Sequence, residues 1–294
     1  MNLRRDLPAS LVVFLVAVPL SLGIALASGA PVIAGLIGAV AGGIVTGLLA
    51  GSPLQVSGPA AGLTVVVFGL VQQLGWETVC LATACAGLVQ LLLGYLKVAR
   101  GTLVIAPSVV HGMLAGIGIS IALAQLHVLL GGAPASSPIA NLLALPARLG
   151  AFSPAAAILG VITIAVLVLW KKLPWAGLRA IPAPLVAVVV GTVVSLVAKM
   201  DVARVDLPEK LAFTQLKLPT EWGIFIVAVL TLAIIASIES LLCAVATDKL
   251  HSGERSNLDK ELTAQGAGNL VSGLLGGLPI TGVIVRSSAN INAG

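Results

Sequence analysis

Apolar stretches of about 20 residues follow one another along almost the whole chain, and this pattern constrains the fold more than any single motif. That length is what a helix needs to cross the hydrocarbon core of a bilayer. Hydrophobic residues make up 58% of the chain and charged residues only 9%, and the mean hydropathy is +1.11. A soluble domain of this size could not cover so much apolar surface. The sequence therefore predicts an all-α polytopic membrane protein.

We expect ten membrane-spanning segments, of which the third and the tenth are broken by Gly and Pro and the ninth is short. They lie at residues 7–28, 31–50, 54–73, 76–96, 105–130, 153–170, 181–198, 221–247, 260–275 and from 278 onward. The longest polar connection, residues 201–220, separates seven segments from the remaining three. We interpret it as an extracytoplasmic linker between a first half, residues 1–200, and the start of a second half, residues 221–294.

The distribution of Lys and Arg predicts the orientation of the chain. Connections on the N-terminal side of the membrane carry ten of these residues: Arg4, Arg5, Lys97, Arg100, Lys171, Lys172, Arg179, Lys249, Arg255 and Lys260. Connections on the other side carry five: Arg148, Lys199, Arg204, Lys210 and Lys217. Because cytoplasmic loops carry the excess of positive charge, we expect a cytoplasmic N-terminus and a location in the plasma or inner membrane.

Two apolar stretches are broken where an ordinary span would be continuous, at residues 52–64 and at residues 276–288. Broken spans at matching places in two halves of a membrane protein are a pointer to the binding site of a transporter. Non-helical backbone is tolerated at that depth only where protein or a water-filled cavity satisfies its polar groups. The alternative is that Gly and Pro merely kink two helices.

The positions of the two breaks also predict a repeat. Each break falls in the third segment of its half, and seven segments precede the linker. A second copy that follows an odd number of crossings must be inverted in the membrane. We therefore expect an inverted-repeat transporter fold that is truncated after about ten spans, with about four spans missing.

In each broken segment we expect a short extended part that leads into a half-helix. Residues 55–57 run extended, and Pro59 begins the first helical turn, where its missing N–H costs nothing. The free N–H groups of the small residues 60–62 then face a cavity, and a helix N-terminus of this kind attracts an anion. In the second half, residues 279–282 are expected to be extended and Val283 to begin the helix.

Two charged residues lie inside the predicted spans. Of the eleven acidic residues, Glu239 alone is deep in a span, where a carboxylate costs about 3 kcal/mol or more unless it is solvated, paired or protonated. Arg286 is the one cation inside a span. Glu239 is thus a candidate for coupling to a proton or another cation, and Arg286 for attracting an anion or balancing Glu239. The alternative for both residues is a structural role between neighbouring helices.

The remaining reactive side chains predict no site. Cys80, Cys85 and Cys243 lie in apolar stretches and lack the spacing of a disulfide framework or a metal site. The alternating charges of residues 249–261 are typical of a solvated cytoplasmic turn. No Ser–His, paired-Asp or metal-binding pattern occurs in the spans. We therefore expect no enzyme activity, no metal, no cofactor and no nucleic-acid partner.

Several motifs together resemble those of the SulP family of anion transporters, the sulfate-permease group. They are residues 31–62 with Ser57-Gly58-Pro59, the stretch Ile238–Leu242, and Gln265–Asn269 leading into Gly276–Gly282, with Arg286 and Asn290 at the places of the family pattern. The resemblance runs over the whole chain, and the motifs are specific when they are taken together.

The resemblance implies a seven-plus-seven inverted repeat in which a core domain moves against a gate domain. Residues 1–100 (spans one to four) and residues 221–294 (spans eight to ten) would belong to the core, and residues 101–200 to the gate. The anion would lie between the N-termini of the third and tenth spans, close to Glu239. Complete members usually carry a cytoplasmic STAS domain after the last span, and we expect a homodimer.

The candidate substrate-binding residues are Pro59, Ala60, Ala61, Gly62, Gly282, Val283, Ile284, Arg286 and Ser21, and the candidate ion-coupling residues are Glu239 and Cys243. Members related to bicarbonate carriers bind sodium with an acid at the place of Glu239 and a hydroxyl residue one turn later. Here the acid is Glu rather than Asp, and the later residue is Cys243, a poor sodium ligand. This departure favours proton coupling, or no coupling, over sodium.

We expect a secondary active transporter that moves a small inorganic anion across the membrane by alternating access. Bicarbonate, sulfate, chloride and dicarboxylates all stay open as substrates. A nucleobase transporter of the same fold is an alternative, but Ala60, Val283 and Ile284 offer few side-chain hydrogen bonds to a base. An anion channel or a voltage-driven motor is a second alternative, and either would show current or charge movement without coupled flux.

Overall fold

The computed structural model describes residues 3–99, 101, 107–133, 138–170, 172–174, 181, 183–202 and 214–293. The chain divides into two compact units, Met1–Leu114 with Leu207–Gly294, and Ala115–Asp206. Most of the predicted linker at 201–220 lies outside the described residues. So do five of the Lys and Arg residues from which the orientation was predicted: Arg100, Lys171, Arg179, Arg204 and Lys210.

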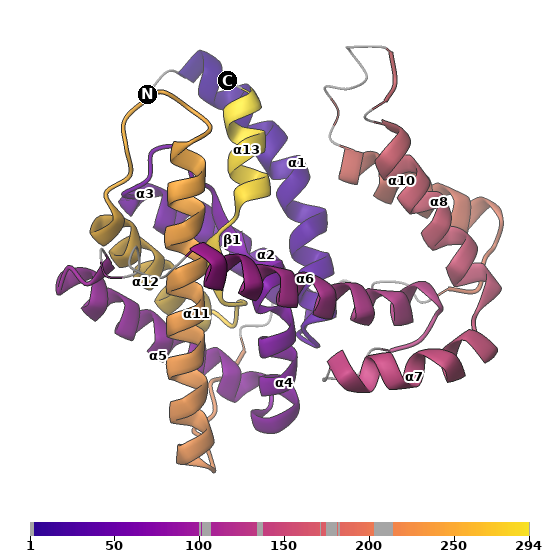
Figure 1. Cartoon of the computed structure of the whole chain (residues 1–294), viewed down its shortest axis with the longest axis horizontal. Helices are drawn as coiled ribbons and strands as arrows, with labels where there is room; N and C mark the ends of the chain where they lie inside the picture. Colours follow the sequence, from indigo (N-terminus) through magenta and orange to yellow (C-terminus); the bar gives the residue numbers. More distant parts are fainter. Residues whose placement is uncertain are drawn as a thin grey trace. The chain divides into compact units, whose positions relative to one another are not determined.

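The larger unit is built from apolar helices packed around two short buried strands (Figure 1). Its helices are α1 (Leu3–Ala27), α2 (Val32–Ala41), α3 (Gly47–Leu49), α4 (Thr64–Leu74), α5 (Trp76–Tyr95), α11 (Trp222–Asp248), α12 (Leu258–Leu274) and α13 (Ile284–Ala293). A π-helical turn, Gly42–Thr46, joins α2 to α3, and a 3-10 turn, Ala61–Leu63, precedes α4. Apolar side chains such as Val67, Val79 and Leu232 form the main core of this unit.

Four helical stretches of the described residues are long and apolar enough to cross a bilayer: Ala9–Ala27, Val32–Leu49, Trp76–Tyr95 and Trp222–Asp248. They correspond to the first, second, fourth and eighth predicted spans. Shorter apolar helices, including Ala61–Leu74, stand where other spans were expected. By length and composition alone, the expectation of ten segments is therefore met only in part.

The smaller unit contains the C-terminal part of α6 (Pro107–Leu129), α7 (Pro138–Gly150), α8 (Pro154–Trp170) and α10 (Ala183–Val197). Helix α7 was not expected, because its 13 residues are too few to cross a bilayer and Pro146 lies inside it. It meets α8 at a bend of 115°. Helices α8 and α10 lie side by side (Figure 1).

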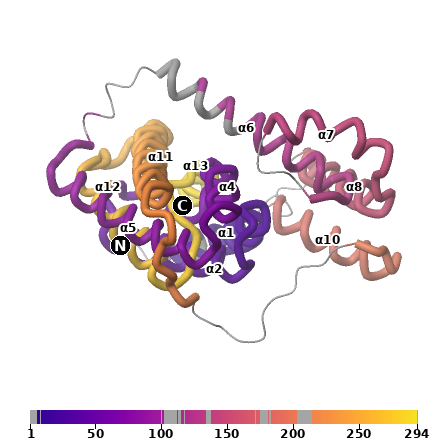
Figure 2. Tube along the Cα trace, turned by 90° about the horizontal axis from the view of Figure 1, so that it is seen from below, coloured from indigo at the N-terminus to yellow at the C-terminus, as the bar shows by residue number. Residues whose placement is uncertain are grey.

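The most extensive helix contact of the larger unit joins α5 to α12, and glycine makes it possible (Figure 2). A Cβ added at Gly266 would lie 2.6 Å from the backbone nitrogen of Leu91 and 2.8 Å from the carbonyl oxygen of Gly87. Small residues allow helix backbones to approach closely in membrane proteins. This contact gives α12 a rigid support, which matters because α12 holds both strands.

Both predicted breaks are confirmed, and their extended parts pair with each other. Strands β1 (Ser57–Pro59) and β2 (Ile280–Gly282) form a two-stranded antiparallel sheet in which Ser57 lies opposite Gly282. All six strand residues are buried. Each break thus supplies backbone partners to the other, which meets the requirement that polar backbone groups at membrane depth be satisfied by protein.

Two glycines of the second span let the sheet approach the helix. A Cβ added at Gly42 would lie 2.7 Å from the carbonyl carbon of Ser57, and one added at Gly38 would lie 2.9 Å from Cγ of Pro59. Gly42 also begins the π-helical turn. Gly38 and Gly42 therefore allow β1 to pack closely against the second span.

The prediction that Pro59 begins a helix is wrong. Pro59 is the last residue of β1, and helical structure begins two residues later at Ala61. The backbone stays extended through Ala60, whose φ and ψ are −114° and 137°. Proline is tolerated here because strand ends and edges do not need its N–H in the ladder. The second half-helix begins at Ile284, one residue after the predicted start.

Gly266→Ala tests the contact between α5 and α12. In an open helix, Gly→Ala stabilises by about 1 kcal/mol. At Gly266 the new Cβ meets backbone atoms, which cannot move aside, so we expect a lower thermal unfolding midpoint. Gly69→Ala in α4 is the matched control, because nothing lies within 4 Å of its added Cβ. Equal midpoints for the two variants, measured by tryptophan fluorescence in detergent, would contradict this packing.

Candidate functional site

The sheet places the N-termini of two half-helices at opposite ends of one short pair of strands. The 3-10 turn Ala61–Leu63 and α4 follow β1, and α13 follows β2. Because the strands are antiparallel, the two helix starts are separated by about 10 Å of strand. The first N–H groups of a helix have no acceptor within the helix and carry a partial positive charge. The interior of the larger unit therefore contains two positive helix ends.

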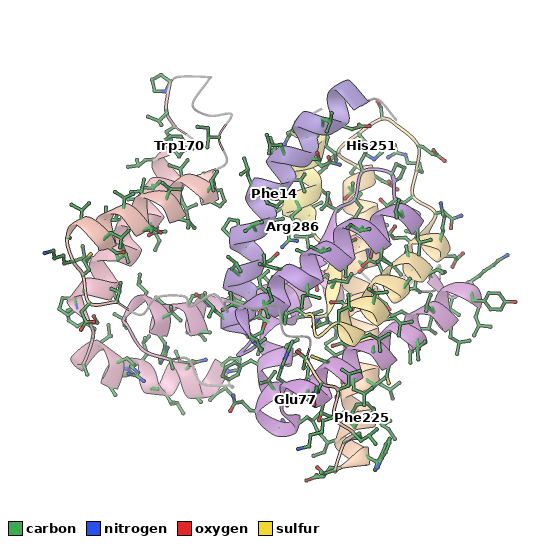
Figure 3. All side chains as sticks on the ribbon, turned by 180° about the vertical axis from the view of Figure 1, so that it is seen from behind. Phe14, Glu77, Trp170, Phe225, His251 and Arg286 are labelled. Carbon is green, nitrogen blue, oxygen red and sulfur yellow. The ribbon has the colours of Figure 1, made fainter. Side chains whose placement is uncertain are left out.

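Arg286 is a buried cation next to this sheet (Figure 3). The residue is 1% exposed, and its Nη2 donates to Oγ of Ser21 at 2.9 Å and to the carbonyl oxygen of Pro59 at 3.3 Å. Its Nε is buried and has no hydrogen-bond partner among the described residues. Among the described residues, no ion pair with Arg286 is found. Because a buried charge without a counter-charge is costly, this guanidinium is suited to receive an anion.

The carboxyl group of Glu239 lies over the turn that precedes α4. A Cβ added at Gly62 would be 2.6 Å from its Oε1 and 2.9 Å from its Cδ. Its Oε2 is buried and has no hydrogen-bond partner in the described part of the chain, so a direct ion pair with Arg286 is not formed there. A negative group suits a helix N-terminus. Glu239 and an incoming anion would therefore compete for the same positive helix end.

Cys243 lies one turn after Glu239 on α11 and packs against the start of α13. Its Sγ is 3.9 Å from Oγ of Ser287 and 3.9 Å from Oγ1 of Thr247. The Ser287 hydroxyl also accepts the N–H of Val56 at 3.0 Å. Cys243 is thus connected to α13 and, through Ser287, to the segment that enters β1.

The structure brings most of the predicted site residues into the interior of the larger unit. Buried residues are Ser21, Pro59, Ala60, Gly62, Cys243, Gly282 and Arg286, partly exposed ones are Glu239 and Val283, and exposed ones are Ala61 and Ile284. Direct contacts join Arg286 to Ser21 and Pro59. The two exposed residues lie at the helix starts, where the backbone rather than the side chain is of interest.

Asn269 supports the site, although no role was predicted for it from the sequence. Its Oδ1 accepts the N–H of Ile280 at 2.7 Å, and its Nδ2 donates to the carbonyl oxygen of the same residue at 2.9 Å. The same Nδ2 donates to Oε1 of Gln90 at 2.8 Å. One amide of α12 therefore holds both backbone groups of the first residue of β2. The sequence signal that could have identified Asn269 is a polar residue within a short apolar span, because a buried amide requires hydrogen-bond partners.

Serine hydroxyls from two helices complete the support of the second break. Oγ of Ser272 donates to the carbonyl oxygen of Leu278 at 2.6 Å. Oγ of Ser240 accepts the N–H of Gly282 at 3.2 Å. Helices α11 and α12 therefore satisfy the backbone that the three-residue ladder leaves unpaired.

Two half-helices that begin beside a buried cation, within apolar membrane-spanning helices, are an arrangement typical of secondary transporters. The fold and the site thus define a multi-pass membrane protein of the transporter class. Residues 3–294 match the family described as the sulfate permease family. The chain belongs to this family, whose members are transporters and not enzymes.

Two bacterial relatives resemble the chain over its whole length. It is 31% identical over 303 residues to the putative sulfate transporter YvdB of Bacillus subtilis strain 168, an alignment that covers 99% of this chain and 56% of that protein. It is 31% identical over 316 residues to the bicarbonate transporter BicA of Picosynechococcus sp. strain PCC 7002, covering 100% of this chain and 54% of that protein. The chain therefore spans about half the length of these relatives.

Solved structures show the same fold. The transmembrane domain of a cyanobacterium bicarbonate transporter BicA superimposes with a TM-score of 0.91 at 29% identity, covering 100% of this chain and 78% of that one. The structure of SLC26A9 superimposes with a TM-score of 0.86 at 19% identity, covering 100% of this chain and 52% of that one, and at this identity the likeness concerns the fold alone. The expected fold class is confirmed.

Asn269→Leu tests the support of β2. The variant leaves the N–H and C=O of Ile280 buried without partners, at about 1–3 kcal/mol for each group, so we expect a strong loss of stability. Asn292→Leu is the matched control, because Asn292 is exposed and donates to Ser288 of its own helix. Thermal unfolding in detergent compares the two variants. A loss for Asn269→Leu no larger than that for the control would show that the amide does not hold the strand.

Proposed function

We propose that this chain forms the anion-binding part of a secondary active transporter, which moves a small inorganic anion of the bicarbonate, sulfate or chloride class by alternating access. The observation that carries the proposal is the buried guanidinium of Arg286, whose Nε has no partner in the part of the chain that the structure describes. The names of the two relatives, a putative sulfate transporter and a bicarbonate transporter, support the same class of substrate.

The proposed position of the anion is between Arg286 and the turn that precedes α4. Arg286 is tied to this region because its Nη2 donates to the carbonyl oxygen of Pro59, two residues before the turn begins. Guanidinium N–H groups form strong, charge-assisted hydrogen bonds to oxoanions. The backbone N–H groups of the turn add further donors, and the small residues Ala61 and Gly62 leave that backbone accessible to a ligand.

An inorganic anion fits these residues better than a nucleobase does. A base is recognised by directional side-chain donors and acceptors. The residues at the two helix starts, Ala60, Val283 and Ile284, have none. A small anion needs only positive charge and N–H donors, which Arg286 and the helix ends provide.

The antiparallel strands support an inverted repeat. Strand β1 leads into α4 and β2 into α13, so the two half-helices leave the sheet from opposite ends. An inverted repeat relates its two halves by a twofold axis in the membrane plane. Two antiparallel strands that lead into equivalent helices meet this symmetry, whereas a direct repeat would require parallel strands.

The two compact units support a division into moving parts. We assign residues 1–100 and 221–294 to a core that carries the anion, and residues 101–200 to a gate. The observed boundary of the units near Leu114 and Leu207 lies close to this division. The excess of Lys and Arg in alternate connections favours a cytoplasmic N-terminus in the plasma or inner membrane, with residues 201–220 as an extracytoplasmic linker.

Glu239 is the proposed proton site. Its carboxyl group covers Gly62 at the helix end proposed for the anion, and a negative charge there opposes anion binding. Protonation removes that charge, so a proton and an anion favour each other's binding. Sodium suits the site less well, because Cys243 offers a soft sulfur where a hard cation prefers oxygen.

Uptake by the full-length protein in proteoliposomes tests this function. We expect saturable uptake of radiolabelled bicarbonate or sulfate that an inward proton gradient stimulates and a sodium gradient does not. Glu239→Gln should lose the stimulation by pH and keep anion binding, because the amide cannot be ionised. Glu254→Gln, in an exposed connection, is the control. Uptake of a nucleobase in place of an anion, or current without coupled flux, would contradict the proposal.

Gly62→Ala tests whether the anion and Glu239 share one helix end. The added Cβ would meet the far end of a flexible side chain, so the fold should tolerate it while the Glu239 carboxyl group is displaced. The new methyl group also covers the backbone N–H groups that are proposed to bind the anion. We therefore expect a near-normal unfolding midpoint and about a tenfold loss of anion uptake, which corresponds to about 1.4 kcal/mol. Gly69→Ala, with nothing within 4 Å, should transport normally. Equal uptake by the two variants would place the anion elsewhere.

A further inference from the structure

Glu261 is a buried carboxylate that the proposed anion site does not use. It lies in the first turn of α12, within the stretch 249–261 that was predicted to be solvated, yet it is only 1% exposed. The prediction is wrong at this residue. A carboxylate that is buried this deeply requires hydrogen-bond donors.

Each of the two carboxylate oxygens of Glu261 accepts two hydrogen bonds. Oε2 accepts the backbone N–H groups of Gly51 and Ser52 at 2.9 and 3.0 Å. Oε1 accepts from Nε2 of Gln55 and Nε2 of Gln265 at 2.9 and 2.8 Å. A carboxylate has about four acceptor positions, so Glu261 is saturated. Three of its four donors belong to the segment 51–57, which leads into β1.

Further hydrogen bonds from α12 and its N-cap residue hold both ends of this segment. Nε2 of Gln265 also donates to Oγ of Ser57, the first residue of β1, at 2.5 Å. At the other end, the carbonyl oxygen of Gly51 accepts the N–H of Asn257 at 2.9 Å. Gly51 permits this approach, because a Cβ there would lie 3.0 Å from the carbonyl carbon of Lys260.

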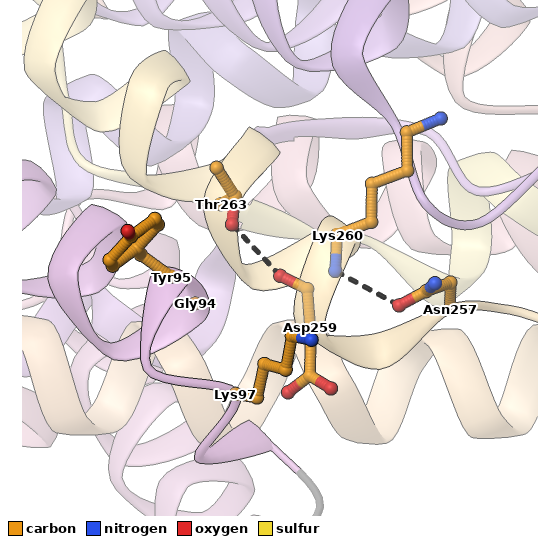
Figure 4. A pocket seen from close by; sticks show the side chains of 7 residues that line it. All are labelled: Gly94, Tyr95, Lys97, Asn257, Asp259, Lys260 and Thr263. Atoms are coloured by element: carbon orange, nitrogen blue, oxygen red, sulfur yellow. Dashed lines mark hydrogen bonds between the residues drawn. The ribbon is translucent and has the colours of Figure 1, made fainter.

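The first turn of α12 is itself fixed, as Figure 4 shows. Oδ1 of Asn257 accepts the N–H of Lys260 at 3.1 Å and so caps the helix. Oγ1 of Thr263 donates to the carbonyl oxygen of Asp259 at 3.0 Å. These residues line an open pocket, whereas Glu261 is enclosed. Glu261 therefore projects from a rigid helix start rather than from a loose loop.

We propose that Glu261 is a positioning residue for the anion site, holding the segment 51–57 against α12 so that β1 pairs with β2 in the observed register. The inference rests on the proposed function, since that function defines the site. The register determines where Pro59 lies, and the carbonyl oxygen of Pro59 is a partner of Arg286. Without the carboxylate, two backbone N–H groups and two amides lose their acceptor, and the strand is free to shift.

The first test measures anion uptake by Glu261→Met in the full-length protein. Met has nearly the length of Glu but no strong acceptor, so we expect KM to rise about tenfold or more while Vmax per folded molecule changes little. Glu254→Met, an exposed acid in the same connection, should leave both values unchanged. A lower total Vmax at an unchanged KM would mean that the variant only reduces the number of folded molecules, and it would overturn the inference.

Glu261→Gln is the conservative variant that should rescue the site. The Oε1 atoms of Gln55 and Gln265 have no hydrogen-bond partner among the residues that the structure describes. Both amides can therefore rotate so that these oxygens accept hydrogen bonds from the new NH₂ group. We expect a KM within about threefold of the parent. Gln265→Met, which removes one of the four bonds and the link to Ser57, is milder than Glu261→Met and should raise KM in the same direction. An unchanged KM for Gln265→Met would count against the inference.

A second measurement does not depend on transport. In a background in which Cys80, Cys85 and any other cysteine of the full-length protein are replaced by Ser, Cys243 is the remaining thiol. It packs against Ser287, which accepts the N–H of Val56. Release of the segment by Glu261→Met should make maleimide labelling of Cys243 several-fold faster than in the Glu254→Met control. Unchanged labelling would overturn the inference. Faster labelling in a protein that transports no anion would support the positioning role and would count against the proposed function alone.

Discussion

The antiparallel pairing of β1 with β2 is the interaction on which the rest of the structure depends. Two broken helices inside an apolar protein leave backbone N–H and C=O groups that lipid cannot satisfy. Each break supplies partners to the other, and Asn269 and Ser240 accept or donate where the short ladder ends. The glycines of the neighbouring helices follow from this pairing, because any larger residue at Gly42 would meet the backbone of β1.

The three charged side chains next to the sheet, Glu261, Arg286 and Glu239, differ in how far their hydrogen bonds are satisfied. Glu261 accepts four hydrogen bonds and has no acceptor position left for a ligand, so its charge serves the backbone around it. Within the described ranges, Nε of Arg286 and Oε2 of Glu239 have no hydrogen-bond partner. This difference separates a supporting group from groups that can bind an anion or a proton. It also explains why we propose a positioning role for Glu261 in α12 and proton binding for Glu239 in α11.

Much of the fold could be predicted from local residue patterns. An apolar run of about 20 residues has one stable form in a bilayer, and α1, α5 and α11 lie within a few residues of their predicted bounds. The two breaks were predictable because Gly and Pro interrupt such runs. Helix α7 was not predictable, because a short helix with an internal proline shows neither a 20-residue apolar run nor the interruption of such a run. Pro59 was misassigned because its extended conformation depends on pairing with Ile280, which lies far away in the sequence.

The length of the apolar stretches and the composition therefore predicted a multi-pass helical membrane protein with two interrupted spans, and the rarity of charge within the spans singled out Glu239 and Arg286. The tertiary structure decided which groups meet. The charge pattern around Glu261 indicates solvent, yet three donors from the segment 51–57 enclose its carboxylate. Partners of this kind come from distant parts of the chain, and a local pattern carries no information about them. The free energy that buries a charge comes from such partners, so only the folded chain determines whether a carboxylate faces water, a ligand or the protein backbone.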